Sequence, residues 1–367
     1  MNKRENWTIN DFLKLTFLRS FTNADLLKII ETFHSFEEFV NSESPFAYKL
    51  RQLEIFQNNK LNDEVSHQID VCQKNNYSII SFWDNDYPEL LKNIPYPPLL
   101  LFVNGKITSD CSYNISIVGT RKNTHYGKLV TEHFVECFVK NGIRIVSGLA
   151  YGIDSIAHST TIKNKGITYA VVASGLDEVN PEIARNLADK IVAEGGAIIT
   201  EYRCGTKSLQ GYFPQRNRII SGMSRATIVI ESAKKGGALI TANFAFDQNR
   251  EVYAVPGNIN SEKSKGTNLL LRNMKAQPAL SPELILEDLG ISSLNRNEKK
   301  QNKLKFKNNN QELVYNSIDS QPIHIDELIH STNIEISELL VILLDLEFDG
   351  YIKQLPGKYY IKGKIDA

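Results

Sequence analysis

The sequence predicts a doubly wound α/β domain, built on a mostly parallel sheet, between a helical lead-in and a C-terminal winged helix. Short apolar runs alternate with helical stretches between residues 115 and 289, helical spacing dominates before them, and a helix-turn-helix-hairpin pattern follows. The predicted domains are residues 1–76, the lead-in, residues 77–290, the α/β domain, and residues 311–367, the winged helix, with a linker at residues 291–310.

The lead-in has apolar residues at three- and four-residue steps, as in Phe12, Leu15 and Leu18 and again between Leu26 and Phe33. This spacing is typical of amphipathic helices. A strand pattern follows at residues 77–82. Prolines between residues 88 and 98 then exclude a continuing helix.

Short apolar runs predict the strands of the α/β domain, and most of them precede an amphipathic helix. They are residues 115–118, 143–146, 168–173, 197–200, 227–230 and 251–255. Runs this apolar suit strands that are covered on both faces. Because helices alternate with them, the connections are expected to be right-handed crossovers that build a parallel sheet.

The C-terminal region begins with a polar stretch. Residues 291–310 contain six basic residues against one glutamate and almost nothing to bury, which predicts a flexible linker. Beyond it we expect a helix from residue 312, a second at 325–329, a turn at 331–333, a longer helix at 335–348 and two strands around Pro356-Gly357. This order is typical of a winged helix.

The composition restricts the cellular setting and the partners. Forty-two basic residues balance 42 acidic residues, so attraction to a polyanion must come from local charge placement. The four cysteines form no CxxC pair, which favours buried thiols over a zinc site or a disulfide framework. Apolar runs fall far short of the roughly 20 residues that span a bilayer, and the polar N-terminus lacks a signal-peptide pattern. We expect a cytoplasmic protein without membrane contact.

Glycines and polar residues follow the predicted strands at their carboxyl ends. Gly119, Thr120 and Arg121 come after the first strand, Gly148 after the second, and Lys234-Lys235 after the fifth. Ligands bind at these ends in open parallel sheets, and the ends share one edge. The sequence therefore predicts a binding crevice there.

A basic segment follows the fourth strand. Between Thr200 and Arg225 there are five basic residues and one acid, a local charge of +4 in a neutral protein. Guanidinium groups suit phosphate oxygens, and aromatic faces stack unpaired bases, so this mixture favours single-stranded nucleic acid. The candidate contacts in the segment are Lys207, Tyr212, Phe213, Arg216, Asn217 and Arg218.

Enzyme motifs are missing from the sequence. No GxxxxGK[ST] phosphate loop occurs, and residues 120–123 lack the glycines of a dinucleotide fingerprint. Neither HExxH nor GxSxG is present. We therefore predict no catalytic residues, metal or cofactor.

Five motifs in order resemble those of the DNA-processing protein A (DprA/Smf) family. They are Ser116-Ile-Val-Gly-Thr-Arg121, Ser147-Gly-Leu-Ala-Tyr-Gly-Ile-Asp154, Phe213-Pro-Gln-Arg-Asn-Arg-Ile-Ile220, Gly237-Ala-Leu-Ile-Thr-Ala242 and Arg250-Glu-Val-Tyr-Ala-Val-Pro-Gly257. The resemblance covers about residues 77–289 and implies an extended Rossmann-like domain after a SAM-like lead-in. It implies a non-enzymatic recombination mediator for natural transformation. Such a protein protects incoming single-stranded DNA, dimerises through the Rossmann-like domain and loads the RecA recombinase.

Carried over by position, the resemblance puts Arg121 in a phosphate pocket with residues 213 and 216–218 beside it. The sequence departs from the family at Gly236-Gly237-Ala238, where Ser-Gly-Ser is expected. The lead-in lacks a glycine-centred DNA-binding hairpin at residues 19–24, so no DNA binding is assigned to it. Asp154 is expected to be structural, because a carboxylate is favourable in a first helical turn.

Two other function classes compete. A Rossmann-like phosphoribohydrolase would carry a Pro-Gly-Gly-x-Gly-Thr turn, which residues 173–177 and 232–237 lack, and release of base from nucleotides would reveal it. A winged-helix transcription regulator would insert residues 335–349 into the major groove, but that helix has five acids and no basic residue. Residues 308–362 contain nine acids and three lysines, so duplex DNA should repel them. We expect this module to bind protein or to fold back onto the basic crevice.

Overall fold

The computed structural model describes residues 7–18, 21–52, 56, 60–179, 182–291, 306, 308–318, 322–349 and 351–362. The chain forms two compact units, residues 1–295 and residues 296–367. The first unit holds both the predicted lead-in and the predicted α/β domain, and the boundary between these at residue 76 stays a prediction. Most of the predicted linker lies outside the described residues.

The first unit begins with the helices of the lead-in. They are α1 (Ile9–Thr16), α2 (Asn23–Thr32), α3 (Phe36–Asn41), α4 (Pro45–Arg51) and α6 (Lys60–Lys74). Thr8 and Thr22 cap α1 and α2 with reciprocal side-chain and backbone hydrogen bonds, which satisfy N–H groups that the helices leave unpaired. The apolar faces of the helices join one buried cluster with sheet residues such as Phe102 and Ile198. The lead-in is therefore packed onto the α/β domain.

The sheet of the first unit runs β1-β2-β6-β5-β4-β3-β7-β8-β9. Its strands are β1 (Ser78–Ser81), β2 (Leu100–Gly105), β3 (Asn114–Val118), β4 (Arg144–Ser147), β5 (Thr168–Val171), β6 (Ala197–Thr200), β7 (Ala226–Val229), β8 (Glu251–Ala254) and β9 (Gln277–Pro278). Within this sheet, the antiparallel pairs among the described strands are those of β2 with β1 and with β6. The expected mostly parallel sheet is confirmed. Strands β2 and β9 were not predicted from the sequence.

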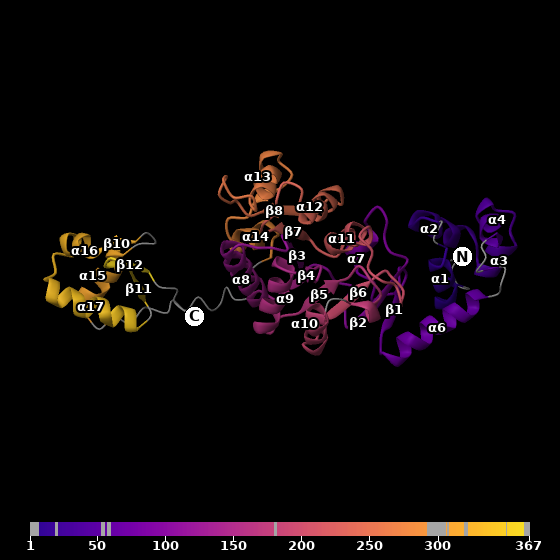
Figure 1. Ribbon diagram of the computed structural model, residues 1–367, viewed down its shortest axis with the longest axis horizontal. Coiled ribbons are helices and arrows are strands. Elements are labelled where there is room, and N and C mark those ends of the chain that lie inside the picture. The colour runs from indigo at the N-terminus through magenta and orange to yellow at the C-terminus, as the bar shows by residue number, and fades with distance from the viewer. Residues whose placement is uncertain are drawn as a thin grey trace. The chain divides into compact units, whose positions relative to one another are not determined.

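Helices cover both faces of this sheet (Figure 1). One face carries α8 (His125–Lys140), α9 (Ile153–Lys163), α10 (Glu182–Ala193) and α14 (Pro282–Asp288). The other carries α7 (Glu89–Lys92), α11 (Tyr212–Gly222), α12 (Gly237–Asp247) and α13 (Lys265–Arg272). Side chains alternate along each strand, so Ile117 packs toward Phe138 of α8 while Val118 packs toward Ile220 of α11.

The connections create a switch point beside β3. From β3 the chain moves outward through β4, β5 and β6, then returns to form β7 on the opposite side of β3. The helices that follow β3 and β7, α8 and α12, consequently lie on opposite faces. A crevice opens at the carboxyl ends of these strands, where the loops after β3 and β7 meet the helices α11 and α12. This is the usual ligand position in this fold class.

The second unit is a winged helix, as predicted. Its elements are α15 (Asn309–Ser317), β10 (Ile323–His324), α16 (Ile325–Thr332), α17 (Ile336–Phe348), β11 (Ile352–Leu355) and β12 (Tyr359–Lys362). The three strands pair in the order β10-β12-β11 around a core that includes Leu328 and Leu343. Helix α16 runs on through Thr332, past the start of the predicted turn, and ends at Asn333 in a left-handed conformation. In neither unit do the described residues include a helix that could cross a membrane.

Candidate nucleic-acid interface

A cavity of about 420 Å³ occupies the crevice at the ends of β3 and β7. The loop after β3, the loop after β7 and the first turns of α11 and α12 supply its walls. Its lining includes Gly119, Thr120, Arg121, Asp154, Phe213, Arg216, Asn217, Ser232, Ala233, Gly236 and Gly237. The structure thus brings together residues that the sequence places far apart.

The buried carboxylate of Glu231 fixes the loop that carries Arg121. Its Oε2 accepts a hydrogen bond from the Thr124 N–H at 2.9 Å, and its Oε1 accepts one from the Thr124 hydroxyl. The backbone N–H of Thr120 donates to the Glu231 carbonyl at 2.9 Å. The loops after β3 and β7 are therefore tied to each other, and α8 begins at a fixed point.

Gly152 lets the loops after β3 and β4 approach closely. Its φ is +80°, and a Cβ at this position would lie 2.3 Å from the carbonyl oxygen of Thr120. Any other residue would combine strain with a backbone clash. Leu149 has a φ of 56°, a left-handed conformation that is uncommon for a leucine. Residues of this kind gather where function or tight packing requires them.

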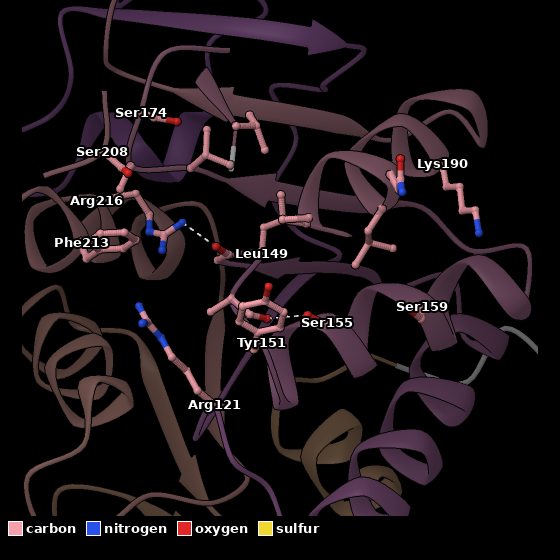
Figure 2. Close-up of a pocket in the computed structure, with 18 of the residues that line it drawn as sticks. Arg121, Leu149, Tyr151, Ser155, Ser159, Ser174, Lys190, Ser208, Phe213 and Arg216 are labelled. Carbon is pink, nitrogen blue, oxygen red and sulfur yellow. Dashed lines mark hydrogen bonds between the residues drawn. The ribbon is translucent and has the colours of Figure 1, made fainter. Parts of the chain in front are cut away.

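A second cavity of about 550 Å³ adjoins the first, beyond the ends of β4 and β5. Arg121, Phe213 and Arg216 line both cavities. Figure 2 shows these three at one end of the second cavity, and Lys190 and Ser159 at the other. Apolar walls lie between the ends and include Leu149, Tyr151, Ile162, Val172 and Leu187. The volume of this cavity lies within the ~300–1,000 Å³ of small-molecule sites.

Arg121 and Phe213 stand at the junction of the two cavities. The Arg121 guanidinium lies 5.4 Å from the centroid of the Phe213 ring, which is cation–π distance. Arg121 is exposed, whereas Phe213 is half-buried. A cation and an aromatic ring thus meet at the junction, with the guanidinium over one face of the ring. Both residues were predicted from the sequence as candidate contacts.

Arg216 forms part of the floor of both cavities. Its side chain is 4% exposed, and its Nη1 donates to the carbonyls of Gly148, at 2.8 Å, and of Val171. Asp154 lies close by and accepts hydrogen bonds from the N–H groups of Gly148 and Ala150 at 3.2 and 3.4 Å. Asp154 therefore has the structural role that the sequence predicts. The phosphate contact of Arg216 stays a prediction, and its geometry favours support of the floor.

Burial controls the titration of this buried pair. Burial raises the pKa of Asp154 to about 6, although the charge of Arg216 and the two backbone N–H groups oppose the rise. Burial also lowers the pKa of Arg216 to about 10, while the Asp154 charge opposes the fall. Each charge thus depends on its partner.

The other predicted contacts lie apart from this junction. Arg218 forms an ion pair with Glu201, and its side chain is 12% exposed. Exposed Lys234 and Lys235 lie before α12. In the described part of the chain, these three line none of the three cavities of this region. Lys207 and Tyr212 line the third of these cavities, which lies beside the segment that follows β6. Whether these residues touch DNA stays a prediction.

The loop after β7 was predicted to reach the crevice through Lys234 and Lys235, but the contribution of the start of α12 was not predicted. Helix α12 starts at this loop without a side-chain cap, so its first N–H groups are available to an anion in the crevice. A Cβ at Gly236 would lie 2.1 Å from the Ser232 hydroxyl oxygen. The Ser232 hydroxyl therefore occupies the space that the side chain of the expected serine at position 236 would need. The paired glycines at the start of α12 were the available signal.

The family described as DNA recombination-mediator protein A matches residues 78–290, and its winged-helix domain matches residues 307–358. The chain belongs to this family. Protein Smf of Synechocystis is 33% identical over 350 residues, which cover 86% of this chain and 87% of that protein. DNA processing protein DprA of Bacillus subtilis is 42% identical over 204 residues, or 55% of this chain and 68% of that protein. The family resemblance inferred from the five motifs is confirmed.

Solved structures of the family agree with the fold. The X-ray structure of DNA processing protein A from Streptococcus pneumoniae superposes with a TM-score of 0.60 at 31% identity, covering 77% of this chain and 98% of that chain. A Helicobacter pylori DNA processing protein A, described for its unique single-stranded DNA binding mode, gives 0.52 at 27% identity, covering 58% and 95%. The extended Rossmann-like prediction is confirmed.

Proposed function

We propose that this protein binds single-stranded DNA in the crevice, and that it acts as a recombination mediator without converting the DNA chemically. The observation that carries the proposal is the placement of Arg121 against Phe213 where two cavities meet. The guanidinium supplies a phosphate contact, and the ring supplies a stacking surface for a base.

The shape of the site favours single strands over duplex DNA. The faces of paired bases are stacked inside a duplex, whereas a single strand can turn a base out into a cavity. The second cavity has apolar walls and lies directly beside Arg121. Base insertion there would discriminate between the two forms without reading sequence.

Family membership supports the wider role. Relatives in the family are named for DNA processing, and the Helicobacter pylori relative is described for single-stranded DNA binding. We infer that the chain protects incoming single-stranded DNA in the cytoplasm during natural transformation. We further infer that it loads the RecA recombinase onto that strand and forms a homodimer through the Rossmann-like domain.

A salt series with labelled oligothymidylate tests the proposal by fluorescence anisotropy. Arg121→Ala should weaken single-strand binding by about 1.5–3 kcal/mol, or roughly 10- to 150-fold. It should also reduce the salt slope by about 0.7 for the lost phosphate contact. Lys140→Ala is a matched control, because this exposed lysine ends α8 at the opposite edge of the sheet.

The same series separates the competing outcomes. Wild-type protein should bind the single strand more tightly than a duplex of the same length. Equal losses in Arg121→Ala and Lys140→Ala would show that only overall charge matters and would overturn the proposal. Base release from nucleoside monophosphates by the wild-type protein would favour the phosphoribohydrolase alternative.

A further inference from the structure

A third cavity of about 620 Å³ lies between the lead-in and the segment that follows β6. Phe17, Glu64 and Gln68 form its lead-in wall. Its other wall includes Arg203, Cys204, Gly205, Thr206, Lys207, Leu209 and Tyr212. It contains Lys207 and Tyr212, two predicted contacts that the crevice does not use.

The walls repeat the chemistry of the crevice. The Arg203 guanidinium lies 3.4 Å from the centroid of the Phe17 ring, which places a cation on an aromatic face. The Tyr212 ring stacks on Tyr202 with centroids 4.4 Å apart and planes 21° apart, so its orientation is fixed. Lys207 is exposed at the rim. The lining contains these two cations and one acid, Glu64, so it keeps a positive balance.

The lead-in holds this wall in place. Gln68 is 5% exposed, and its amide donates to the Cys204 carbonyl at 3.2 Å. This bond ties α6 to the segment after β6, while Arg203 ties the same segment to the end of α1. The cavity is therefore built by contacts between two parts of the first unit.

The third cavity continues the line of the first two. The neighbours Tyr212 and Phe213 begin α11, and Tyr212 lines the third cavity whereas Phe213 lines the other two. Ser208 lines the second cavity, while Lys207 lines the third. In strand order the cavities lie beyond β7 and β3, then β4 and β5, then β6. They follow the carboxyl edge of the sheet.

We propose that the third cavity is a further nucleotide subsite, occupied by the same single strand after it leaves the crevice. Lys207 and Arg203 would contact its phosphate, and Tyr212 would stack against its base. This inference rests on the proposed single-stranded DNA binding. It gives the lead-in a role as one wall of the binding track, although the lead-in carries no DNA-binding motif of its own.

Oligonucleotide length tests the subsite on the full chain. Oligothymidylates of about 4 nucleotides should fill the crevice only, whereas those of about 12 should reach the third cavity. Lys207→Gln should weaken binding of the longer strand about 3- to 10-fold and lower its salt slope by about 0.7, with the shorter strand unaffected. Tyr212→Leu should weaken the longer strand roughly 5- to 100-fold. Lys106→Gln is the control, because Lys106 follows β2 at the amino end of β6.

A second measurement does not depend on the variants. A longer oligonucleotide that carries photoreactive halogenated uracils should crosslink to peptides containing Phe17 or Tyr212. If Arg121→Ala weakens both strands while Lys207→Gln and Tyr212→Leu change neither and no such crosslink forms, the subsite is refuted and the crevice stands. If Arg121→Ala also leaves the affinity for both oligonucleotides unchanged, the proposed function is refuted together with the subsite.

Discussion

Replacing Arg216 by methionine should destabilise the first unit strongly. Methionine keeps much of the side-chain volume but donates no hydrogen bond, so the carbonyls of Gly148 and Val171 lose their donor. The substitution also leaves the buried carboxylate of Asp154 without its neighbouring guanidinium. Leaving a buried acceptor without its donor costs about 1–3 kcal/mol, and two carbonyls lose theirs, so we expect a loss of about 2–5 kcal/mol.

Urea unfolding of the full chain, followed by circular dichroism, measures this loss. Adding Asp154→Asn to Arg216→Met should restore part of the stability, because the neutral amide oxygen can still accept from Gly148 and Ala150. Arg121→Met should change stability by less than about 0.5 kcal/mol, since that side chain is exposed. A loss below about 1 kcal/mol for Arg216→Met would refute the buried-pair reasoning.

Three further outcomes follow from the same structure. Phe213→Leu should weaken single-strand binding by about 1–3 kcal/mol in anisotropy titrations, and Phe213→Tyr should retain it, because only the aromatic face is needed. Burial lowers the pKa of His158 in the folded protein to about 3. As pH falls below about 6.5, the imidazole therefore takes up a proton in the unfolded chain but not in the folded one, which favours unfolding. Wild-type stability should therefore fall more than that of His158→Gln between pH 7 and pH 4.5 in urea titrations. The isolated winged helix has its own core, and gel shifts with duplex DNA should show no tight, steeply salt-dependent binding, because its net charge is −6.

Apolar runs were sufficient to predict the parallel strands, because strands buried on both faces must be apolar throughout. The antiparallel strand β2 was missed although residues 99–103 form an apolar run. Its direction depends on pairing with β6, almost 100 residues away, which no local pattern specifies. The two-residue strand β9 has too few residues to show a pattern.

The candidate site shows a similar division. Arg121 could be predicted, because it follows a glycine at a strand end, where parallel sheets bind ligands. Arg216 and Arg218 were treated alike, but positions two apart on a helix do not share a face. On α11 one guanidinium is directed to the cavity floor and the other to Glu201. The third cavity could not be foreseen, because it exists only where the lead-in packs against the segment after β6.

The distance between Arg121 and the nearest phosphate oxygen, in a crystal structure of the full chain with oligothymidylate, tests the central claim most directly. We predict a guanidinium nitrogen within about 2.7–3.2 Å of that oxygen, with a base against the Phe213 ring. A strand bound at the opposite edge of the sheet, or on the winged helix, with the crevice empty, would contradict the account.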